Sequence, residues 1–325
     1  MIEGHGDDAY RYKGIRSDFS SNICAHGSHQ ALLSHLAACP ELIGHYPEPE
    51  AWSLEKLIAE RHDIDPRCVI VTNGATDAIY LIAQAFSDFQ PTIPSPTFSE
   101  YEDASRCFMH TERQREQGKS ILWLCNPNNP TGKVYDQTYI DHMMIAHDMV
   151  VIDQSYEQYT DACLWTPRWA VRTDYSIQIH SMTKTYAVPG LRLGYITAHA
   201  RLTEYLRRFL RPWSVSALAI EAGKFLLQHD ELLCKPDLAE AQRLHKRLSE
   251  TAGVTTLFTQ TNFMLCHLEQ NTAAALKEYL ACEKGMLIRD ASNFRGLSPH
   301  HFRIAAQTPA ENDALVEAIQ CFINR

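Results

Sequence analysis

The chain of 325 residues lacks any long uninterrupted apolar run. No stretch approaches the roughly 18 consecutive apolar residues that read as a membrane-spanning helix, so we expect no membrane partner. The N-terminus has neither a basic segment nor an apolar segment behind it, so we expect no secretory signal peptide. Internal repeats and low-complexity tracts are also absent. These absences favour an ordinary globular protein.

The sequence also lacks closely spaced cysteine pairs and an excess of positive charge. Its ten cysteines are scattered and none forms a C-x-x-C pair, which disfavours a disulfide framework or zinc site and favours reduced thiols in the cytoplasm. Neither His26 with His29 nor His300 with His301 has a cysteine or carboxylate at ligand spacing, so no metal site is expected. The net charge of -9, without a long basic run, disfavours nucleic acid as a partner.

What is present is an alternation of short apolar runs with helical segments. Strands are expected at 69–72, 121–125, 149–153, 176–180 and 193–197, with helices at 75–86 and 135–148. Strands that alternate with helices predict an α/β fold with a large, doubly wound, mainly parallel sheet and helices on both faces.

The pattern changes after residue 212. Helices are expected at 215–229, 236–250, 273–284 and 311–323, and strands at 255–268, 286–289 and 302–306. These elements predict a smaller α+β domain, and the polar first 22 residues predict an extended arm. We therefore expect an N-terminal arm and part of the small domain at 1–45, a large domain at 46–213 and a small C-terminal domain at 214–325.

Polar motifs follow several of the expected strands, where open α/β sheets bind ligands. In 72–77, Gly74 permits a tight turn, and the next backbone N–H groups form a helix N-terminus suited to phosphate. The prolines and glycine of 125–132 hold an asparagine side chain rigidly. Taken singly, the first motif is also compatible with an ordinary strand-to-helix turn and the second with an ordinary loop.

Two charged residues stand at the ends of apolar strands. Asp153 ends a buried strand, where it could cap the next segment or pair with a protonated ring nitrogen. Lys184 comes just past another strand, with Ser181 three residues before it and Arg192 eight after it. A solvated surface lysine is the usual alternative, but this one lies in a Gly/Pro-rich segment between two apolar strands.

The ordered motifs NGATD, PSPTF, NPNNPTG, DQSY and SMTK with GLRLG resemble the fold-type I aminotransferase superfamily. The segment FRIAAQTPAEND extends the resemblance over nearly the whole chain. It implies the fold of pyridoxal 5′-phosphate (PLP)-dependent transferases, PLP as cofactor and a small amino-acid substrate.

The resemblance implies roles for particular residues. Lys184 matches the Schiff-base lysine, which also shuttles a proton, and Asp153 matches the carboxylate that keeps the pyridine nitrogen protonated. Tyr156 and Asn129 match the pair that hydrogen-bonds the ring O3′.

Further matches surround the cofactor. Phe98 matches the aromatic residue that stacks on the ring. Ala75 and Thr76 match the turn that holds the phosphate, and Ser181 and Arg192 complete that cup.

Two more matches concern the partner subunit and the substrate. Tyr46 matches a tyrosine that reaches the phosphate of the neighbouring subunit's cofactor, which implies a homodimer with shared active sites. Arg303 matches the arginine that binds the substrate α-carboxylate.

The fold alone does not determine which reaction is catalysed, so the subfamilies have to be distinguished by residues near the two ends of the chain. Two subfamilies share the NPNNPTG motif: threonine-phosphate decarboxylases of cobalamin biosynthesis and histidinol-phosphate aminotransferases. His5 with Gly6, the segment 18–22 and the segment 288–297 resemble the decarboxylases more closely. The implied reaction converts L-threonine O-3-phosphate to (R)-1-amino-2-propanol O-2-phosphate and carbon dioxide. We expect Arg303, with Arg289 or Arg295, to orient the substrate.

The N-terminal arm is the candidate for the substrate phosphate, through His5 and Asn22, although it could serve domain packing alone. The proline usual after this asparagine is missing, and the segment 111–120 is short. A non-catalytic, PLP-binding regulatory protein is the alternative of another class, but no helix-turn-helix extension is present.

Overall fold

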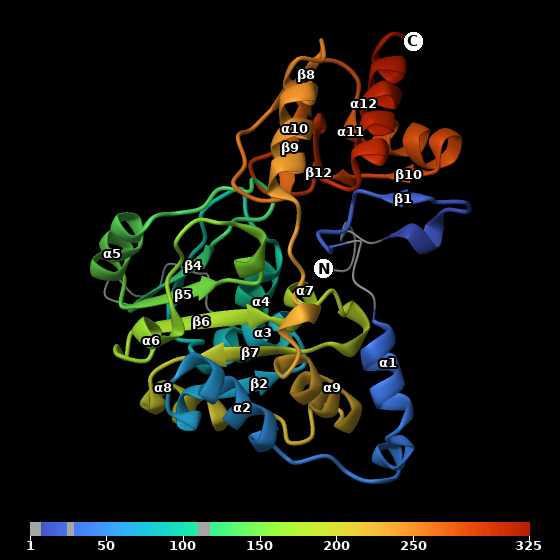
Figure 1. The fold of residues 1–325 in the computed structure, drawn as a ribbon. Coiled ribbons are helices and arrows are strands. Elements are labelled where there is room, and N and C mark those ends of the chain that lie inside the picture. Colours follow the sequence, from blue (N-terminus) through green and yellow to red (C-terminus); the bar gives the residue numbers. More distant parts are fainter. Residues whose placement is uncertain (1–7, 25–28, 110–117) are drawn as a thin grey trace.

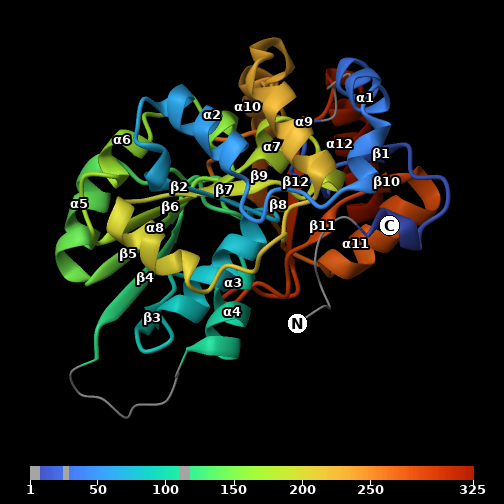
Figure 2. The same cartoon turned by 90° about the horizontal axis from the view of Figure 1, so that it is seen from below.

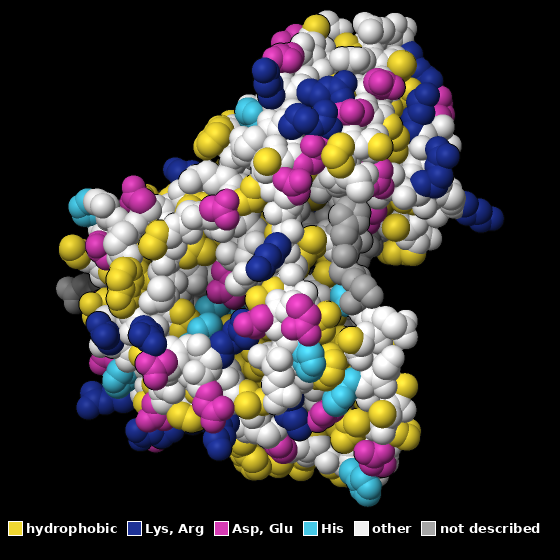
Figure 3. Space-filling view, in the orientation of Figure 1, with side chains coloured by type: hydrophobic (Ala, Val, Ile, Leu, Met, Phe, Trp, Pro, Cys, Tyr) yellow, Lys and Arg dark blue, Asp and Glu magenta, His cyan; other side chains and the backbone are white. Residues whose placement is uncertain are grey.

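The computed structural model describes residues 8–24, 29–109 and 118–325. Figure 1 shows two bodies, each built on its own sheet, with the N-terminal arm beside the upper one. Within the described ranges, no helix combines the length and the apolar character needed to cross a membrane. Side chains of both charge signs are interspersed over the face of both bodies shown in Figure 3.

The large body is organised by a six-stranded sheet in the order β2-β7-β6-β5-β4-β3. Its strands are β2 (Val69–Thr72), β3 (Gln90–Thr92), β4 (Ser120–Cys125), β5 (Met149–Asp153), β6 (Ser176–Ser181) and β7 (Gly194–Thr197). Strands β3 to β6 are parallel, and only β7 runs antiparallel to its two neighbours β2 and β6. The prediction of a mainly parallel sheet is confirmed.

Apart from the edge strand β3, the strands of this sheet are buried on both faces because their side chains alternate between two hydrophobic cores. Ile70 of β2 packs into one core, while its neighbours Val69 and Val71 pack into the other. In β4, Trp123 lies with the first core and Leu122 with the opposite face. This double burial explains why the strands appear in the sequence as continuous apolar runs.

Helices cover both faces, as Figure 2 shows for α3 and α4 on one side and α2 and α9 on the other. The hydrophobic clusters place α8 with α3 and α4, and α1, α5 and α6 with the opposite face. The helices of this body are α1 (Gln30–Ala37), α2 (Trp52–His62), α3 (Ala75–Ala85), α4 (Glu100–Phe108), α5 (Gln137–Ala146), α6 (Pro167–Ala170), α7 (Met182–Thr185), α8 (Ala200–Arg207) and α9 (Ala217–Leu227).

The small body packs helices against a four-stranded antiparallel sheet in the order β11-β12-β9-β8. Its elements are α10 (Leu238–Ser249), β8 (Val254–Thr256), β9 (Phe263–Leu268), α11 (Ala273–Tyr279), β10 (Met286–Leu287), β11 (Arg289–Asp290), β12 (His301–Ala305) and α12 (Pro309–Ile323). A capping box of Thr308 and Glu311 starts α12. The arm joins this body, since β1 (Ser17–Asp18) pairs with β10 and Phe19 is buried in its core.

Short turns complete the chain. They are 3₁₀ turns at Ala9–Arg11, Pro40–Gly44, Pro66–Cys68, Glu157–Tyr159, Pro189–Leu191 and Asp230–Leu232, and a π-helical turn at Leu280–Lys284.

The predicted strand 255–268 is wrong, because β8 and β9 form a hairpin there. Between them, the hydroxyls of Thr259 and Thr261 donate to the Phe263 carbonyl at 2.6 and 2.9 Å. Such local side-chain bonds to the backbone compete with a continuous strand. The predicted strand 286–289 is likewise divided, because β10 pairs with β1 whereas β11 pairs with β12.

The packing of α1 and α9 bears on the predicted domain division. Leu32 of α1 and Ile220 of α9 are buried in the same core as Leu54 and Val71 of the large body. This packing favours a division in which α1 and α9 belong to the large body and the small domain starts near α10. The domain boundaries themselves stay a prediction.

Candidate active site

A cavity of about 280 Å³ lies beyond the carboxyl ends of β4, β5 and β6. Residues of both bodies and of the arm line it, which is where an open α/β sheet is expected to bind a ligand. Most of the predicted site residues line this cavity: Asn22, Ala75, Thr76, Phe98, Asn129, Asp153, Tyr156, Ser181, Lys184, Arg192 and Arg303.

One end of the cavity is a cradle for an anion, formed where β2 turns into α3. Gly74 adopts a left-handed φ of 85°, and a Cβ there would lie 2.7 Å from Nη2 of Arg192. At Gly194 a Cβ would meet the backbone nitrogen of Ala75 at 2.7 Å. These glycines let the guanidinium and β7 approach the start of α3, whose first N–H groups have no partner within the helix. With Ser181 on the same wall, the cradle suits a phosphate.

Asp153 lies on the floor of the cavity at the end of β5 and is 3 % exposed. The Tyr101 hydroxyl donates to its Oδ2 at 2.7 Å, and the Ser155 backbone N–H donates to its Oδ1 at 2.8 Å. Burial raises the pKa of this carboxyl, while the hydrogen bonds from Ser155 and Tyr101 oppose the shift. The carboxylate is thus oriented by two donors in a water-poor place, where a cationic N–H would pair with it strongly.

Lys184 and Tyr156 lie next to each other in the wall. Lys184 is in the short helix α7 directly after β6, and its Nζ is 5.7 Å from the centre of the Tyr156 ring. The Tyr159 hydroxyl donates to the Lys184 carbonyl at 3.1 Å and so helps to hold its backbone. Burial raises the pKa of Tyr156 to about 12, against the opposing charge of Arg303, so its hydroxyl is a neutral donor at physiological pH.

Arg303 brings the small body to the cavity. It stands in β12, is 5 % exposed, and donates to Oδ1 of Asn129 and to the Ser20 carbonyl, both at 2.5 Å. Its Nε has no hydrogen-bond partner in the described ranges. Burial lowers the pKa of this guanidinium to about 10, so it remains a cation at neutral pH. A buried cation that forms no ion pair with a carboxylate of the described residues suits a site for an anionic ligand.

The arm supplies another polar group. Asn22 is 2 % exposed, and neither its Oδ1 nor its Nδ2 forms a hydrogen bond with the part of the chain that the structure describes. Buried amide atoms are nearly always paired, so an unpaired amide in a cavity wall points to a ligand.

Two predicted residues, Tyr46 and Arg289, do not line this cavity. Tyr46 is 86 % exposed, and its ring lies 5.5 Å from that of Trp213 on the surface. Arg289 stands opposite Arg303 on the edge strand β11 and donates to the Asp290 carbonyl and to Asn293. His5 lies outside the described residues.

Arg295, the other candidate for orienting the substrate, also lies outside the cavity wall. It forms an ion pair with Glu102 of α4 at 2.5 Å and donates to the Ile93 carbonyl. It therefore connects the small body to the large one.

Sequence reasoning missed other residues of the wall: Ser20, Ser21, Ile23, Tyr101, Cys125, Ser155, Thr183 and Pro189. Tyr101 is the most informative of these because it holds Asp153 directly. Its position three residues after Phe98, in the first turn of α4, is the signal that could have identified it.

The chain is similar to known proteins over most of its length. The model of the family "Aminotransferase class I and II" matches residues 109–319, more than half of the chain. The crystal structure of L-threonine-O-3-phosphate decarboxylase from Porphyromonas gingivalis superimposes with a TM-score of 0.90 at 36% identity, covering 95% of this chain and 100% of that one.

Two relatives from Caldanaerobacter subterraneus are also similar. A provisionally named threonine-phosphate decarboxylase is 32% identical over 97% of this chain and 93% of its own length. A histidinol-phosphate aminotransferase is 28% identical over 85% of this chain and 83% of its own. Because the family match and these similarities together span both bodies and the cavity between them, this chain belongs to the class I and II aminotransferase family of enzymes.

Proposed function

We propose that this enzyme binds PLP and decarboxylates L-threonine O-3-phosphate, giving (R)-1-amino-2-propanol O-2-phosphate and carbon dioxide for cobalamin biosynthesis. The observation that carries the proposal is the 36% identity to the L-threonine-O-3-phosphate decarboxylase, which covers 95% of this chain. The buried Arg303 cation and the unpaired Asn22 amide provide suitable groups for a substrate with two anionic ends.

The cavity fits PLP, the cofactor of this family. The helix terminus at Ala75 and Thr76, with Ser181 and Arg192, would hold the phosphate. Asp153 would bind the ring nitrogen. When bound, PLP supplies an electron sink for the charge that develops at the substrate Cα.

The remaining side chains around the ring would fix its position. Phe98 would stack on the ring face. Tyr156 and Asn129 would hydrogen-bond its O3′ oxygen, for which the neutral Tyr156 hydroxyl is a ready donor.

Lys184 would hold the cofactor and later move a proton. After the substrate amine has replaced it, the Lys184 Nζ would give a proton to Cα. In the overall reaction the bond from Cα to the carboxylate carbon breaks, its electron pair remains with Cα, carbon dioxide leaves, and Cα gains that proton.

The choice of reaction depends on orientation. The bond at Cα that stands perpendicular to the ring is the one that breaks: the carboxylate bond for decarboxylation, the Cα–H bond for transamination. Arg303, held by Asn129 and Ser20, is placed to fix the carboxylate in the first orientation. Asn22 and His5 of the arm are our candidates for the substrate phosphate.

We also propose that the enzyme is a homodimer in the cytoplasm. Apolar side chains gather on the surface near Tyr46, which is 86 % exposed beside Trp213 at 50 %. A second subunit would cover them, and its Tyr46 would complete the phosphate site. The cysteines of the described ranges are all free thiols, which suits a reducing compartment.

The test is turnover without a second substrate. Purified protein loaded with PLP should release carbon dioxide from L-threonine O-3-phosphate in the absence of any 2-oxo acid. If turnover instead requires 2-oxoglutarate with histidinol phosphate, the aminotransferase alternative is correct. Cofactor binding without turnover of either substrate would favour the regulatory alternative.

Tyr101→Phe tests whether Asp153 depends on its buried hydrogen bond. We expect kcat for decarboxylation to fall about 10- to 100-fold, because a hydrogen bond to a charged group contributes about 1.5–3 kcal/mol. The control is Tyr205→Phe, which removes a tyrosine hydroxyl bonded to the Ala85 carbonyl at the other end of α3. Equal kcat values in the two variants would contradict the proposed role of Tyr101.

A further inference from the structure

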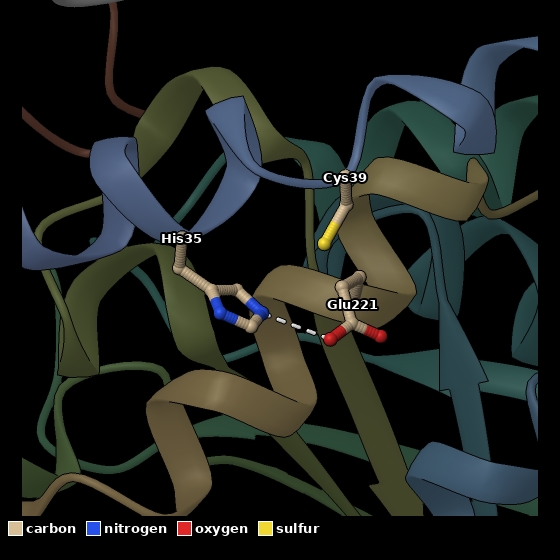
Figure 4. A group of neighbouring side chains, drawn as sticks. All are labelled: His35, Cys39 and Glu221. Atoms are coloured by element: carbon tan, nitrogen blue, oxygen red, sulfur yellow. Dashed lines mark hydrogen bonds and ion pairs between the residues drawn. The ribbon is translucent and has the colours of Figure 1, made fainter.

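Three side chains of metal-ligating types converge where α1 packs against α9, away from the active-site cavity. Figure 4 shows His35, Cys39 and Glu221 directed toward a common space. One ligand atom from each, an imidazole nitrogen, the thiol sulfur and a carboxylate oxygen, lies within 4.8 Å of the other two. Among the described residues, this is the only such group of three.

The local sequence places two of the ligands on one side of the chain. His35 is in α1, and Cys39 follows it by four residues. The Cys39 backbone N–H donates to the Leu36 carbonyl at 3.1 Å, so the chain keeps coiling just beyond the helix. Residues four apart in a helical turn share a face, which brings the imidazole and the thiol together.

The third ligand comes from α9, and its neighbours already orient it. Nε2 of His35 lies 2.9 Å from Oε1 of Glu221, while Lys224 holds the other oxygen, Oε2, at 2.6 Å. The His35 ring stacks on Phe225 with 4.4 Å between ring centres. Outer contacts of this kind fix the direction of metal ligands.

The surroundings also keep the ligands reachable. The side chains of His35 and Glu221 are 30% and 21% exposed, so an ion could enter without unfolding the helices.

A thiolate, an imidazole and a carboxylate suit a tetrahedral borderline metal such as zinc, with water as the fourth ligand, rather than magnesium or calcium. Zinc bonds of about 2.0–2.3 Å keep tetrahedral ligands roughly 3.5 Å apart. The thiol would have to move inward by about an ångström and the His35–Glu221 pair open slightly, which are side-chain adjustments.

We propose that His35, Cys39 and Glu221 form a zinc-binding site that ties α1 to α9. Neither helix contributes to the wall of the active-site cavity, so the ion is structural and takes no part in the reaction. Its effect is to strengthen the attachment of α1 to the large body. The simpler hypothesis is that His35 and Glu221 form an ion pair without a metal. The two hypotheses differ in the role of Cys39, which binds the ion only in the zinc-site hypothesis.

Cobalt(II) is the probe that separates these readings, because a bound thiolate gives it a strong near-ultraviolet charge-transfer absorbance. The full-length, metal-stripped protein should bind one Co²⁺ per chain with this absorbance, and Zn²⁺ should displace it. Cys39→Ser should abolish the band and weaken Zn²⁺ binding at least about 10-fold, the low end for loss of even an outer contact. His35→Gln should weaken binding similarly.

The matched control is Cys163→Ser, which removes an exposed cysteine elsewhere. It should leave the band and the Zn²⁺ affinity unchanged. Melting of each variant without metal checks that it folds, and Zn²⁺ should raise the Tm of wild type but not of Cys39→Ser. Absence of a thiolate band in wild type, or its persistence in Cys39→Ser, would overturn the proposal whatever the enzyme's reaction proves to be.

Discussion

Lys184→Ala should reduce the decarboxylation of L-threonine O-3-phosphate by at least about 10⁴-fold, because the proposed mechanism assigns two tasks to this one residue. The variant loses both the covalent hold on PLP and the amine that gives a proton to Cα. Its other cofactor contacts remain: the α3 terminus, Arg192 and Asp153 all line the same cavity. We therefore expect PLP to bind still, but without the visible absorbance band of the lysine-linked cofactor.

Turnover and the absorbance spectrum of the PLP-loaded protein check this expectation. Lys133→Ala is the matched control, since Lys133 is exposed on the loop after β4, outside the cavity wall, with its Nζ over the Tyr135 ring. It should keep both the band and the activity. If Lys184→Ala retained activity within about tenfold of wild type, Lys184 would not be the catalytic lysine.

Arg303→Met should raise KM for L-threonine O-3-phosphate by about 100-fold or more and should also lower kcat. Losing a buried cation that pairs with a carboxylate costs about 3–5 kcal/mol, and its loss also releases the substrate from the orientation that favours decarboxylation. Arg303→Lys should restore only part of the affinity, because an ammonium cannot form the paired hydrogen bonds of a guanidinium.

Steady-state kinetics across pH provide the measurement. Because burial lowers the pKa of Arg303 to about 10, the cation that binds the carboxylate persists through neutral pH and is lost only as pH rises through about 10. In Arg303→Met, which has no guanidinium to deprotonate, KM should not show this additional rise as pH increases through about 10. Arg295→Met, which removes a half-exposed guanidinium outside the cavity, should change KM by less than about threefold. An unchanged KM in Arg303→Met would contradict the assignment.

Local sequence determined the elements whose signals depend on near neighbours. The strand at 149–153 was predicted with its observed ends, because both of its faces are buried and the run is apolar up to the terminal Asp153. The hairpin of β8 and β9 was missed, since the hydroxyls of Thr259 and Thr261 form the turn from residues with good strand propensity. Whether α9 belongs to the large or the small body depends on which hydrophobic core buries Ile220. That core is built from residues far from Ile220 in the sequence.

The sequence by itself determined the residues at the carboxyl ends of the strands, because the family's motifs are contiguous: Lys184, Asp153 and the turn at Gly74 needed only their neighbours in the chain. Only the tertiary structure decided what meets across the cavity. Arg303 reaches Asn129 over 174 residues, and Tyr101 reaches Asp153 over 52.

The position of Arg289 was also decided at this level. It stands on β11 in register with Arg303 of β12 but is not among the residues that line the cavity, and its role in substrate binding stays a prediction. Likewise, His35 and Cys39 suggest no metal site until Glu221, 186 residues after His35, is packed beside them. The physical reason is common to these cases: motifs specify local backbone geometry, whereas contacts between distant segments follow from how the two cores pack together.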